Sequence, residues 1–272
     1  MAHRVPLVSL GVPVFNGESF LADALDSLLA QTCGDFELVI ADNASTDATE
    51  AICRDYLAMD ARIRYVRHDR NMGAPANWNF VARQARGEYF KWASANDVCA
   101  PTFLEECATA LTSDPGVVLC FEEARPSERF KRVCRDLAMN NAQSGVVRRD
   151  ALLRTRLVRP YPSGDMVLTA ELALLGRIRL LPSTLLYRRT GGSSMTSRMS
   201  AEALARVFDP AGKGTYRGTV IRRHLDTIST AFRAAPTWSE RVPTALGALQ
   251  DAAWSRAAIW RELRELIGVR TL

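Results

Sequence analysis

The sequence predicts an α/β protein with a doubly wound, mostly parallel sheet flanked by helices, followed by a helical extension. Two observations support this prediction. Over about the first 120 residues, short apolar runs rich in β-branched side chains alternate with segments whose apolar residues recur at helical spacing. From about residue 200 onward the segments are all of the helical type, and Pro210, Pro236 and Pro243 are expected to interrupt them.

The elements are expected in strict alternation. The predicted strands are 5–14, 36–41, 63–67, 89–93 and 117–121, and the predicted helices are 19–31, 46–59, 74–86 and 101–113. Ser45 or Thr46 is the expected cap of the second helix, and Gly87 is expected to end the third. Further on, 122–150 is polar and helical in pattern, 166–175 is apolar, 177–187 contains a strand, and 190–197 is a loop.

Length, charge and cysteine usage set limits on the protein class. The 272 residues suffice for one large domain, or for one domain with an appendage. A net charge of +5 fits an ordinary basic surface as well as a polyanionic or membrane partner. Six cysteines without a C-x-x-C pair indicate buried, reduced thiols of a cytosolic protein rather than a zinc site. No signal peptide and no membrane-spanning segment is expected.

Unusual residues follow the predicted strands, and ligands of such sheets bind at the carboxyl ends of the strands. In VPVFNGESF the chain turns at Asn16 and Gly17, and Glu18 lies at a helix start. Glu18 fits a favourable position in the helix dipole as well as a place in a nucleotide pocket. In IADNASTDATE, Asp42 and Asn43 follow a strand. The Asp42 carboxylate could accept hydrogen bonds from a base or a ribose, or cap the next helix.

The third segment is DRNMGAPANWNF. It contains a turn at Asn71 and Gly73, and it places Asn77 and Asn79 in the first turns of a helix. Because asparagine is a poor residue for a helix interior, these two side chains are expected to act as caps or to contact a ligand.

Together these segments resemble the inverting glycosyltransferases of family two, which have the GT-A fold. The resemblance lies in VSLGVPVFNG, VIADNASTDAT, NMGAPANWN and ARGEYFKWASANDVCAPTFLE, in that order; it is dense over about residues 5–120 and thinner to about 195. It implies a GT-A domain over 1–195, with a nucleotide-binding half to about 120 and an acceptor half beyond, and a helical extension over 196–272. It also implies a donor-binding set: Pro13, Phe15, Asn16, Glu18, Asp42, Asn43, Ser45, Asn77 and Asn96.

The metal site of the family has changed in this chain. The family's acidic turn normally reads Asp-x-Asp-Asp, and it aligns here with Ser94, Ala95, Asn96 and Asp97. The resemblance therefore implies that Asp97 binds Mn²⁺ or Mg²⁺, with Asn96 as a neutral ligand or a contact to a sugar hydroxyl. Such ions often take only one or two protein carboxylates, because diphosphate and water supply the other oxygens. The alternative is that Asn96 and Asp97 cap the following helix.

The segment SGDMVLTAELALLGR, residues 163–177, resembles the family's acceptor-facing helix. In this alignment Gly164 replaces the usual Glu, Asp165 is the retained Asp, and Glu171 takes the place of a frequent Arg. The resemblance implies that Asp165 is the general base that takes the proton of the acceptor hydroxyl. The alternative role of Asp165 is a helix cap.

Two further features depart from the family or extend it. The His that often follows a Tyr-Arg pair is absent, because Thr190 follows Arg188 and Arg189. One of these arginines could offset phosphate charge, or both could lie at a solvated strand end. The tail carries Trp238, Trp254 and Trp260, and a possible apolar stripe of Ala253, Ile259, Leu263, Leu266 and Ile267. Core packing, a homodimer, or a peripheral membrane carrying a lipid-linked acceptor would each explain it.

We therefore expect a cytoplasmic, metal-dependent, non-processive glycosyltransferase of polysaccharide biosynthesis, acting in the cytoplasm or at the inner face of the membrane. The resemblance implies a UDP or dTDP sugar donor, a glycan, lipid-linked or small-molecule acceptor, and no nucleic-acid partner. The first alternative is a nucleotide-sugar-binding protein that has lost catalysis. A nucleotidyltransferase is disfavoured, because the first turn has only Gly17 and no cationic residue.

Overall fold

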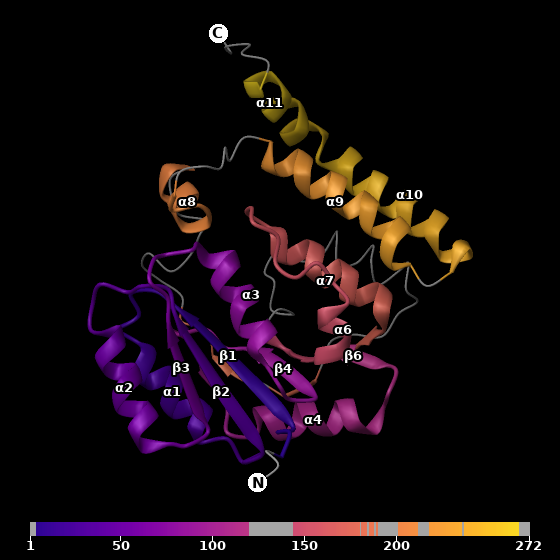
Figure 1. Ribbon diagram of the computed structural model, residues 1–272. Helices are drawn as coiled ribbons and strands as arrows, with labels where there is room; N and C mark the ends of the chain where they lie inside the picture. Colours follow the sequence, from indigo (N-terminus) through magenta and orange to yellow (C-terminus); the bar gives the residue numbers. More distant parts are fainter. Residues whose placement is uncertain are drawn as a thin grey trace.

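The computed structural model describes residues 4–119, 144–179, 181–183, 185–187, 189, 201–211, 218–235 and 237–266. These residues form a central sheet with helices on both faces and a layer of helices on the side of the later strands (Figure 1). The sheet and the C-terminal helices confirm the predicted α/β class with its helical extension.

The described residues form a seven-stranded sheet in the order β3-β2-β1-β4-β7-β6-β8. Its strands are β1 Val8–Val14, β2 Phe36–Asp42, β3 Ile63–Arg67, β4 Tyr89–Trp92, β6 Val117–Leu119, β7 Val146–Arg148 and β8 Arg177–Ile178. Strands β1 to β4 pair in parallel, and β7 runs antiparallel to both of its neighbours, β4 and β6. The sheet is therefore mostly parallel, and its first half is the doubly wound unit predicted from the sequence.

Alternate residues of the strands enter two separate cores, as the two-residue period of a strand requires. On one face, Leu38 and Ile40 pack with side chains of α1 Leu21–Leu29, α2 Thr49–Met59 and α4 Phe103–Ser113. On the other face, Val39 and Ala41 pack with α3 Ala74–Gln84, α6 Arg149–Leu153 and α7 Gly164–Leu175. Both faces of the sheet are covered, which explains why most residues of β1 and β2 are apolar.

Several local predictions were wrong. Residues 146–148, inside the stretch 122–150 expected to be helical, form strand β7, in which Val146 and Val147 are buried between two strands. Residues 120–143, which include the end of the predicted strand 117–121 as well as Cys120 and Cys134, lie outside the described residues. The strand expected within 177–187 is two strands, β8 in the main sheet and β9 Leu186–Tyr187, which pairs with β5 Val98–Cys99. The predicted loop 190–197 is also outside the described residues.

Two helix boundaries differ from the prediction for a physical reason. Helix α2 begins at Thr49, and neither Ser45 nor Thr46 caps it; the Asp47 carboxylate accepts the Thr49 amide and hydroxyl instead. Pro243 does not interrupt a helix, because it lies inside α10, which runs from Trp238 to Trp254. The α10 side chains at Thr244 and Ala248 are fully buried, so tertiary packing holds the helix through its proline.

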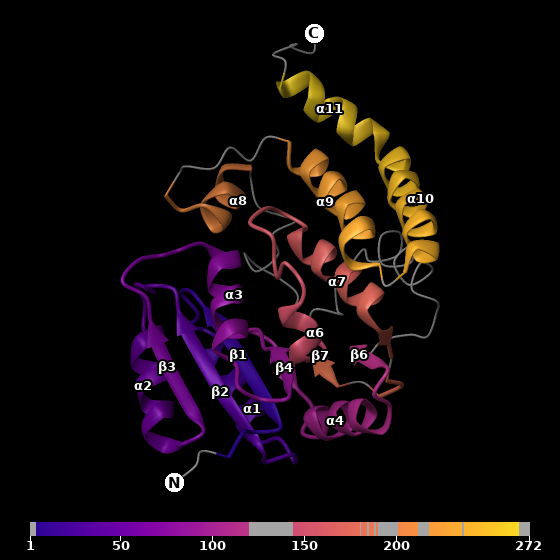
Figure 2. The same ribbon diagram turned by 45° about the vertical axis from the view of Figure 1, so that its right-hand side comes forward.

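The C-terminal helices are α8 Ala201–Phe208, α9 Thr219–Ala234, α10 and α11 Arg256–Leu266. Helix α9 packs on α7, and α10 packs on α9, so the extension forms successive layers beyond the sheet (Figure 2). None of the described helices is long and apolar enough to cross a bilayer. Among the described cysteines no disulfide is formed, and burial raises the pKa of the Cys53 thiol to about 12, as expected for a buried, reduced thiol.

Candidate active site

The turns that follow β1 and β2 are locked together at the carboxyl edge of the sheet. The Asn16 amide donates to Ser45 Oγ at 2.9 Å, and Asn16 Oδ1 accepts from the Thr46 amide at 2.9 Å. Glu18 Oε2 accepts from the Ala48 amide at 2.9 Å. These bonds bring the predicted residues Asn16, Glu18 and Ser45 together, while Phe15 keeps 48% of its surface exposed beside them.

Asp42 is fully buried below these turns. Its Oδ1 accepts from the Ser45 amide at 2.8 Å, and its Oδ2 accepts from the Tyr65 hydroxyl at 3.0 Å and lies 3.4 Å from Arg67 Nε. Burial, and then the bond to Asp42, raise the pKa of Tyr65. The carboxylate thus holds the second turn in place, and its contact with a nucleoside stays a prediction.

Asparagine side chains join the third motif to the second. Asn43 Nδ2 donates to Asn71 Oδ1 at 2.8 Å, and Asn77 Nδ2 donates to the Ala41 carbonyl at 2.8 Å. Asn77 Oδ1 is also 3.1 Å from His68 Nε2, a residue to which the sequence assigned no role. Asn43 and Asn77 are each 2% exposed, so both amides satisfy buried backbone or side-chain groups.

Asn79 makes a link that the sequence did not reveal. Its Nδ2 donates to the Val158 carbonyl at 2.8 Å, and its Oδ1 accepts from the Val158 amide at 2.9 Å. This pair of bonds fastens helix α3 to the chain segment that precedes α7. Nothing in the local pattern of the sequence indicates a contact between residues so far apart.

The altered acidic turn lies against the first turn of the site. A Cβ atom added at Gly17 would be 3.8 Å from the Ala95 Cβ. Within the turn, Ser94 Oγ contacts Asn96 Oδ1, and Asp97 Oδ1 accepts from the Arg189 amide at 3.1 Å. Strand β5 pairs with β9 directly after Asp97, which brings Arg189 to this turn from the far end of the domain.

Arg189 is a cationic residue beside the predicted metal ligand Asp97. Its Nη2 lies 3.0 Å from Asp23 Oδ2, its Nε lies 3.4 Å from the Asn96 carbonyl, and its guanidinium sits 4.2 Å from the centre of the Phe20 ring. Arg189 therefore lies beside the acidic turn, its contact with a phosphate stays a prediction, and Arg188 lies outside the described residues. The sequence did not point to Asp23 or Phe20.

The acidic turn offers few ligands for a divalent metal. Within the described ranges, no three His, Cys, Asp or Glu side chains gather in a way that could hold an ion. Asp97 is a single, partly exposed carboxylate, and the Asn96 amide oxygen is already in contact with Ser94. This donor set fits a metal that takes most of its oxygens from diphosphate and water, and it does not fit one held by protein side chains alone.

Asp165 occupies the first turn of α7, one residue inside the helix. The preceding residues explain the local sequence: Ser163 has a left-handed φ of 65°, and a Cβ added at Gly164 would come within 2.3 Å of the Arg159 carbonyl. The tight turn therefore leaves no room for a side chain at position 164. Asp165 is partly exposed, and it is not the capping residue, because Ser163 holds that position. A carboxylate in the first turn is favoured by the helix dipole.

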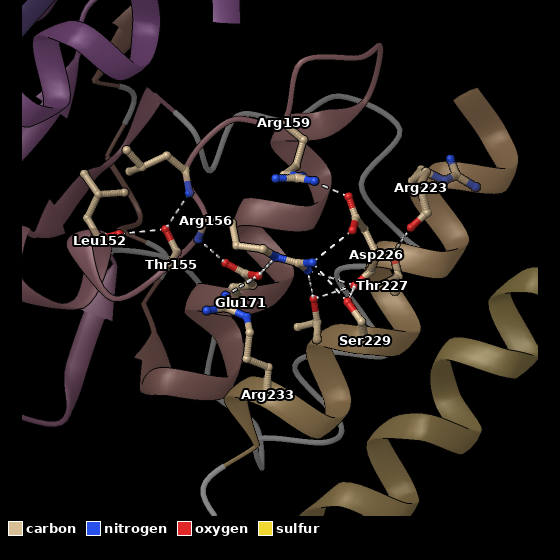
Figure 3. A network of polar contacts seen from close by, with 12 residues as sticks. Leu152, Thr155, Arg156, Arg159, Glu171, Arg223, Asp226, Thr227, Ser229 and Arg233 are labelled. Atoms are coloured by element: carbon tan, nitrogen blue, oxygen red, sulfur yellow. Dashed lines mark hydrogen bonds and ion pairs between the residues drawn. The ribbon is translucent and has the colours of Figure 1, made fainter. Parts of the chain in front are cut away.

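A buried polar network joins α7 to α9 (Figure 3). Glu171, which is fully buried, accepts from the Arg156 amide at 2.7 Å and from Arg156 Nε at 2.6 Å. Arg233 of α9 adds a third bond to the same carboxylate at 2.6 Å. The unusual Glu171 of the sequence is thus a central acceptor for two arginines, one of them from the C-terminal extension.

The network continues to Asp226 on α9. Arg156 Nη1 and Arg159 Nε each lie 2.9 Å from its carboxylate (Figure 3). The Tyr161 hydroxyl also donates to it. Burial alone would raise the pKa of Asp226, but the bonds from Tyr161 and Arg159 lower it overall. Burial and the bond to Asp226 raise the pKa of Tyr161. The loop before Asp165 is therefore held between α7 and α9.

The sequence of this chain is similar to those of known glycosyltransferases. Residues 9–167 match the protein family described as "Glycosyl transferase family 2". "Putative glycosyltransferase EpsH" of Bacillus subtilis is 31% identical over 135 residues, 50% of this chain and 39% of that protein. "Putative teichuronic acid biosynthesis glycosyltransferase TuaG" of the same species is 28% identical over 156 residues, 54% of this chain and 61% of its own length. The chain thus spans less than two thirds of these relatives.

Solved structures show the same fold. S. aureus TarS 1–349 in complex with UDP-GlcNAc superposes with a TM-score of 0.66 at 20% sequence identity, over 90% of this chain and 72% of that chain. The mannosyltransferase PcManGT from Pyrobaculum calidifontis, in complex with GDP-Man and Mn²⁺, gives a TM-score of 0.57 at 19% identity, over 99% of this chain and 77% of its own.

Proposed function

Because the chain belongs to glycosyl transferase family 2 and has the GT-A fold, we propose that it transfers a sugar from a nucleotide-diphosphate donor to a hydroxyl acceptor with inversion. The observation that carries the proposal is the meeting of all four motif segments at one edge of the sheet. Asn16 is hydrogen-bonded to Ser45 and Asn43 to Asn71, and Gly17 lies next to Ala95.

The reaction that these residues would support is a single displacement. The acceptor oxygen forms a bond to the anomeric carbon from the face opposite the diphosphate, and the bond from that carbon to the phosphate oxygen breaks. Asp165 takes the acceptor proton, since it is a partly exposed carboxylate at the start of α7. The network around Glu171 and Asp226 holds the loop and helix on which Asp165 lies.

Asp97 would hold a divalent metal ion on the donor diphosphate, and the ion would supply positive charge for the leaving group. Arg189 supports this role of the turn, because its backbone amide already fixes the Asp97 carboxylate and its guanidinium lies next to Asn96. The same guanidinium is a candidate contact for a phosphate oxygen, where it would make charge-assisted bonds. The solved structures bound to UDP-GlcNAc and to GDP-Man with Mn²⁺ are consistent with such a donor, and a UDP or dTDP sugar remains the proposed one.

The replacement of Asp97 by alanine tests the metal site. We expect calorimetric titration of the wild type with UDP, GDP and dTDP in Mn²⁺ to select one nucleotide, and Asp97→Ala to weaken that binding at least about tenfold. EDTA should lower the nucleotide affinity of the wild type by the same factor and leave the affinity of the variant unchanged. Asp55→Ala, an exposed carboxylate on α2, is the matched control. Equal affinities of Asp97→Ala and wild type in Mn²⁺ would remove Asp97 from the metal site.

A second candidate function follows from Ser94 and Asn96, which stand where the family has carboxylates. A nucleotide-sugar-binding protein without catalysis would bind the selected nucleotide and release none from the intact donor. Metal-dependent hydrolysis of the donor separates the two, because only an enzyme shows it. We also propose a glycan, lipid-linked or small-molecule acceptor, a cytoplasmic location and a place in polysaccharide biosynthesis; the similarity to TuaG, whose name refers to teichuronic acid biosynthesis, supports the last of these.

A further inference from the structure

The outermost helices of the protein carry an exposed apolar face. On α10, the side chains of Trp238, Val242, Leu246 and Leu249 are 75%, 62%, 59% and 52% exposed. Their spacing of three and four residues places all four on one side of the helix. The opposite side is buried against α9 through Thr244, Gly247, Ala248 and Asp251. We define the four exposed residues as the α10 face.

The same arrangement continues on α11, which follows α10 after the single residue Ser255. Trp260 is 62% exposed, and it lies four residues from Arg256 and from Arg264, both of which are exposed. Ile259 and Leu263, which the sequence suggested as part of an apolar stripe, are only partly exposed. The exposed side of α11 therefore presents one tryptophan between two arginines.

On the described part of helices α9 to α11 the exposed charges are positive, and carboxylates pair with groups inside the protein. Among the described side chains of α9 to α11, those that are both charged and exposed are all arginines: Arg222, Arg233, Arg256, Arg261 and Arg264. Three acidic side chains of these helices have partners within the protein. Asp226 binds Arg156 and Arg159, Asp251 lies 3.1 Å from His224, and Glu262 accepts from the Val220 and Ile221 amides at the start of α9.

We propose that the α10 face and the Trp260 side of α11 dock on an anionic lipid surface. Tryptophan, with an apolar ring and one N–H donor, favours the boundary between acyl chains and headgroups. Arginine can lay its aliphatic stem along that boundary and keep its charge among anionic headgroups. The helices lie at the edge of the molecule away from the sheet in both views, so the sheet does not obstruct such contact (Figures 1 and 2).

The positive charge of this surface favours an anionic lipid surface over a second copy of the chain as its binding partner. A two-fold dimer through this face would bring the patch against itself. Arginines of one copy would then meet arginines of the other, and the described side chains of α9 to α11 include no exposed carboxylate that could neutralise them. The headgroups of an anionic membrane would neutralise these arginines, and the apolar side chains of the α10 face would insert among the lipids.

Vesicle co-sedimentation of the full chain tests the docking. We expect binding to vesicles of phosphatidylcholine mixed with phosphatidylglycerol to be at least about tenfold tighter than to phosphatidylcholine alone, and to weaken as salt rises. Trp238→Ser combined with Leu246→Ser should lower binding at least about tenfold, and so should Arg256→Gln combined with Arg264→Gln. Met59→Ser, a 68% exposed apolar residue on α2, is the matched control and should bind as the wild type does.

Other results would overturn the proposal. Absence of wild-type binding to the mixed vesicles would do so, and so would equal binding by both double variants and the wild type. A dimer in sedimentation equilibrium that Trp238→Ser with Leu246→Ser dissociates, without any vesicle binding, would assign the face to a second copy. The arginine variants keep the test valid if the apolar variant unfolds, because they alter exposed charges alone. Nucleotide titration is not used in this test, so its outcome is separate from that of the proposed sugar transfer.

Discussion

Replacing Asp165 by asparagine is expected to lower the rate of donor turnover by about 10²–10⁴-fold, because the acceptor oxygen would lose the group that takes its proton. The substitution keeps the size and the hydrogen-bonding shape of the side chain, so the tight turn at Gly164 should not change. The measurement is the initial rate of nucleotide release from the donor that the calorimetric titration selects. Water can serve as the acceptor in this assay, which makes the result independent of the unknown natural acceptor.

Two further measurements distinguish a general-base role of Asp165 from a structural role. The affinity for the nucleotide should stay within about twofold of the wild type, because a base contacts the acceptor and not the diphosphate. Asp150→Asn, an exposed carboxylate in the first turn of the neighbouring helix α6, should retain full activity. If Asp165→Asn turns over the donor as fast as Asp150→Asn does, another residue must take the proton.

The sequence predicted the longer strands well because burial on both faces favours apolar residues along a strand. Strands β1, β2 and β4 are almost entirely buried and most of their residues are apolar, so each could be recognised in the sequence. The three-residue β7 and the two-residue β5 and β9 depend on distant partners, and runs so short carry almost no periodic signal. Pro243 shows the opposite case, in which packing on α9 overrides a local preference.

The candidate site was predictable to a similar extent. The order of the motifs placed the four turns on the same sheet edge, because the carboxyl ends of parallel strands lie together. The contacts within the site were not predictable. Asn79 reaches Val158, and Arg189 reaches Asp23, Phe20 and Asp97, across large separations in sequence. Only the folded chain shows that the Asp42 carboxylate accepts hydrogen bonds from the Ser45 amide and the Tyr65 hydroxyl.

Glu171→Ala is expected to lower the free energy of unfolding by about 3–5 kcal/mol, which is a large share of the total for a domain of ordinary stability. The carboxylate is fully buried and accepts three hydrogen bonds from Arg156 and Arg233. Its removal leaves Arg156, whose side chain is 19% exposed, with a charge that Asp226 only partly balances. Urea unfolding followed by circular dichroism measures the loss.

Asp35→Ala is the matched comparison, because Asp35 pairs with Arg4 on the surface, where the two side chains are 38% and 86% exposed. Such a pair contributes at most about 1 kcal/mol, so its loss should be small. If Glu171→Ala costs no more than Asp35→Ala, the network does not stabilise the contact between α7 and α9. If it costs the larger amount in a single cooperative transition, then the C-terminal helices unfold together with the helix that carries Asp165. The extension would then be an integral support of the proposed acceptor side rather than a separate unit.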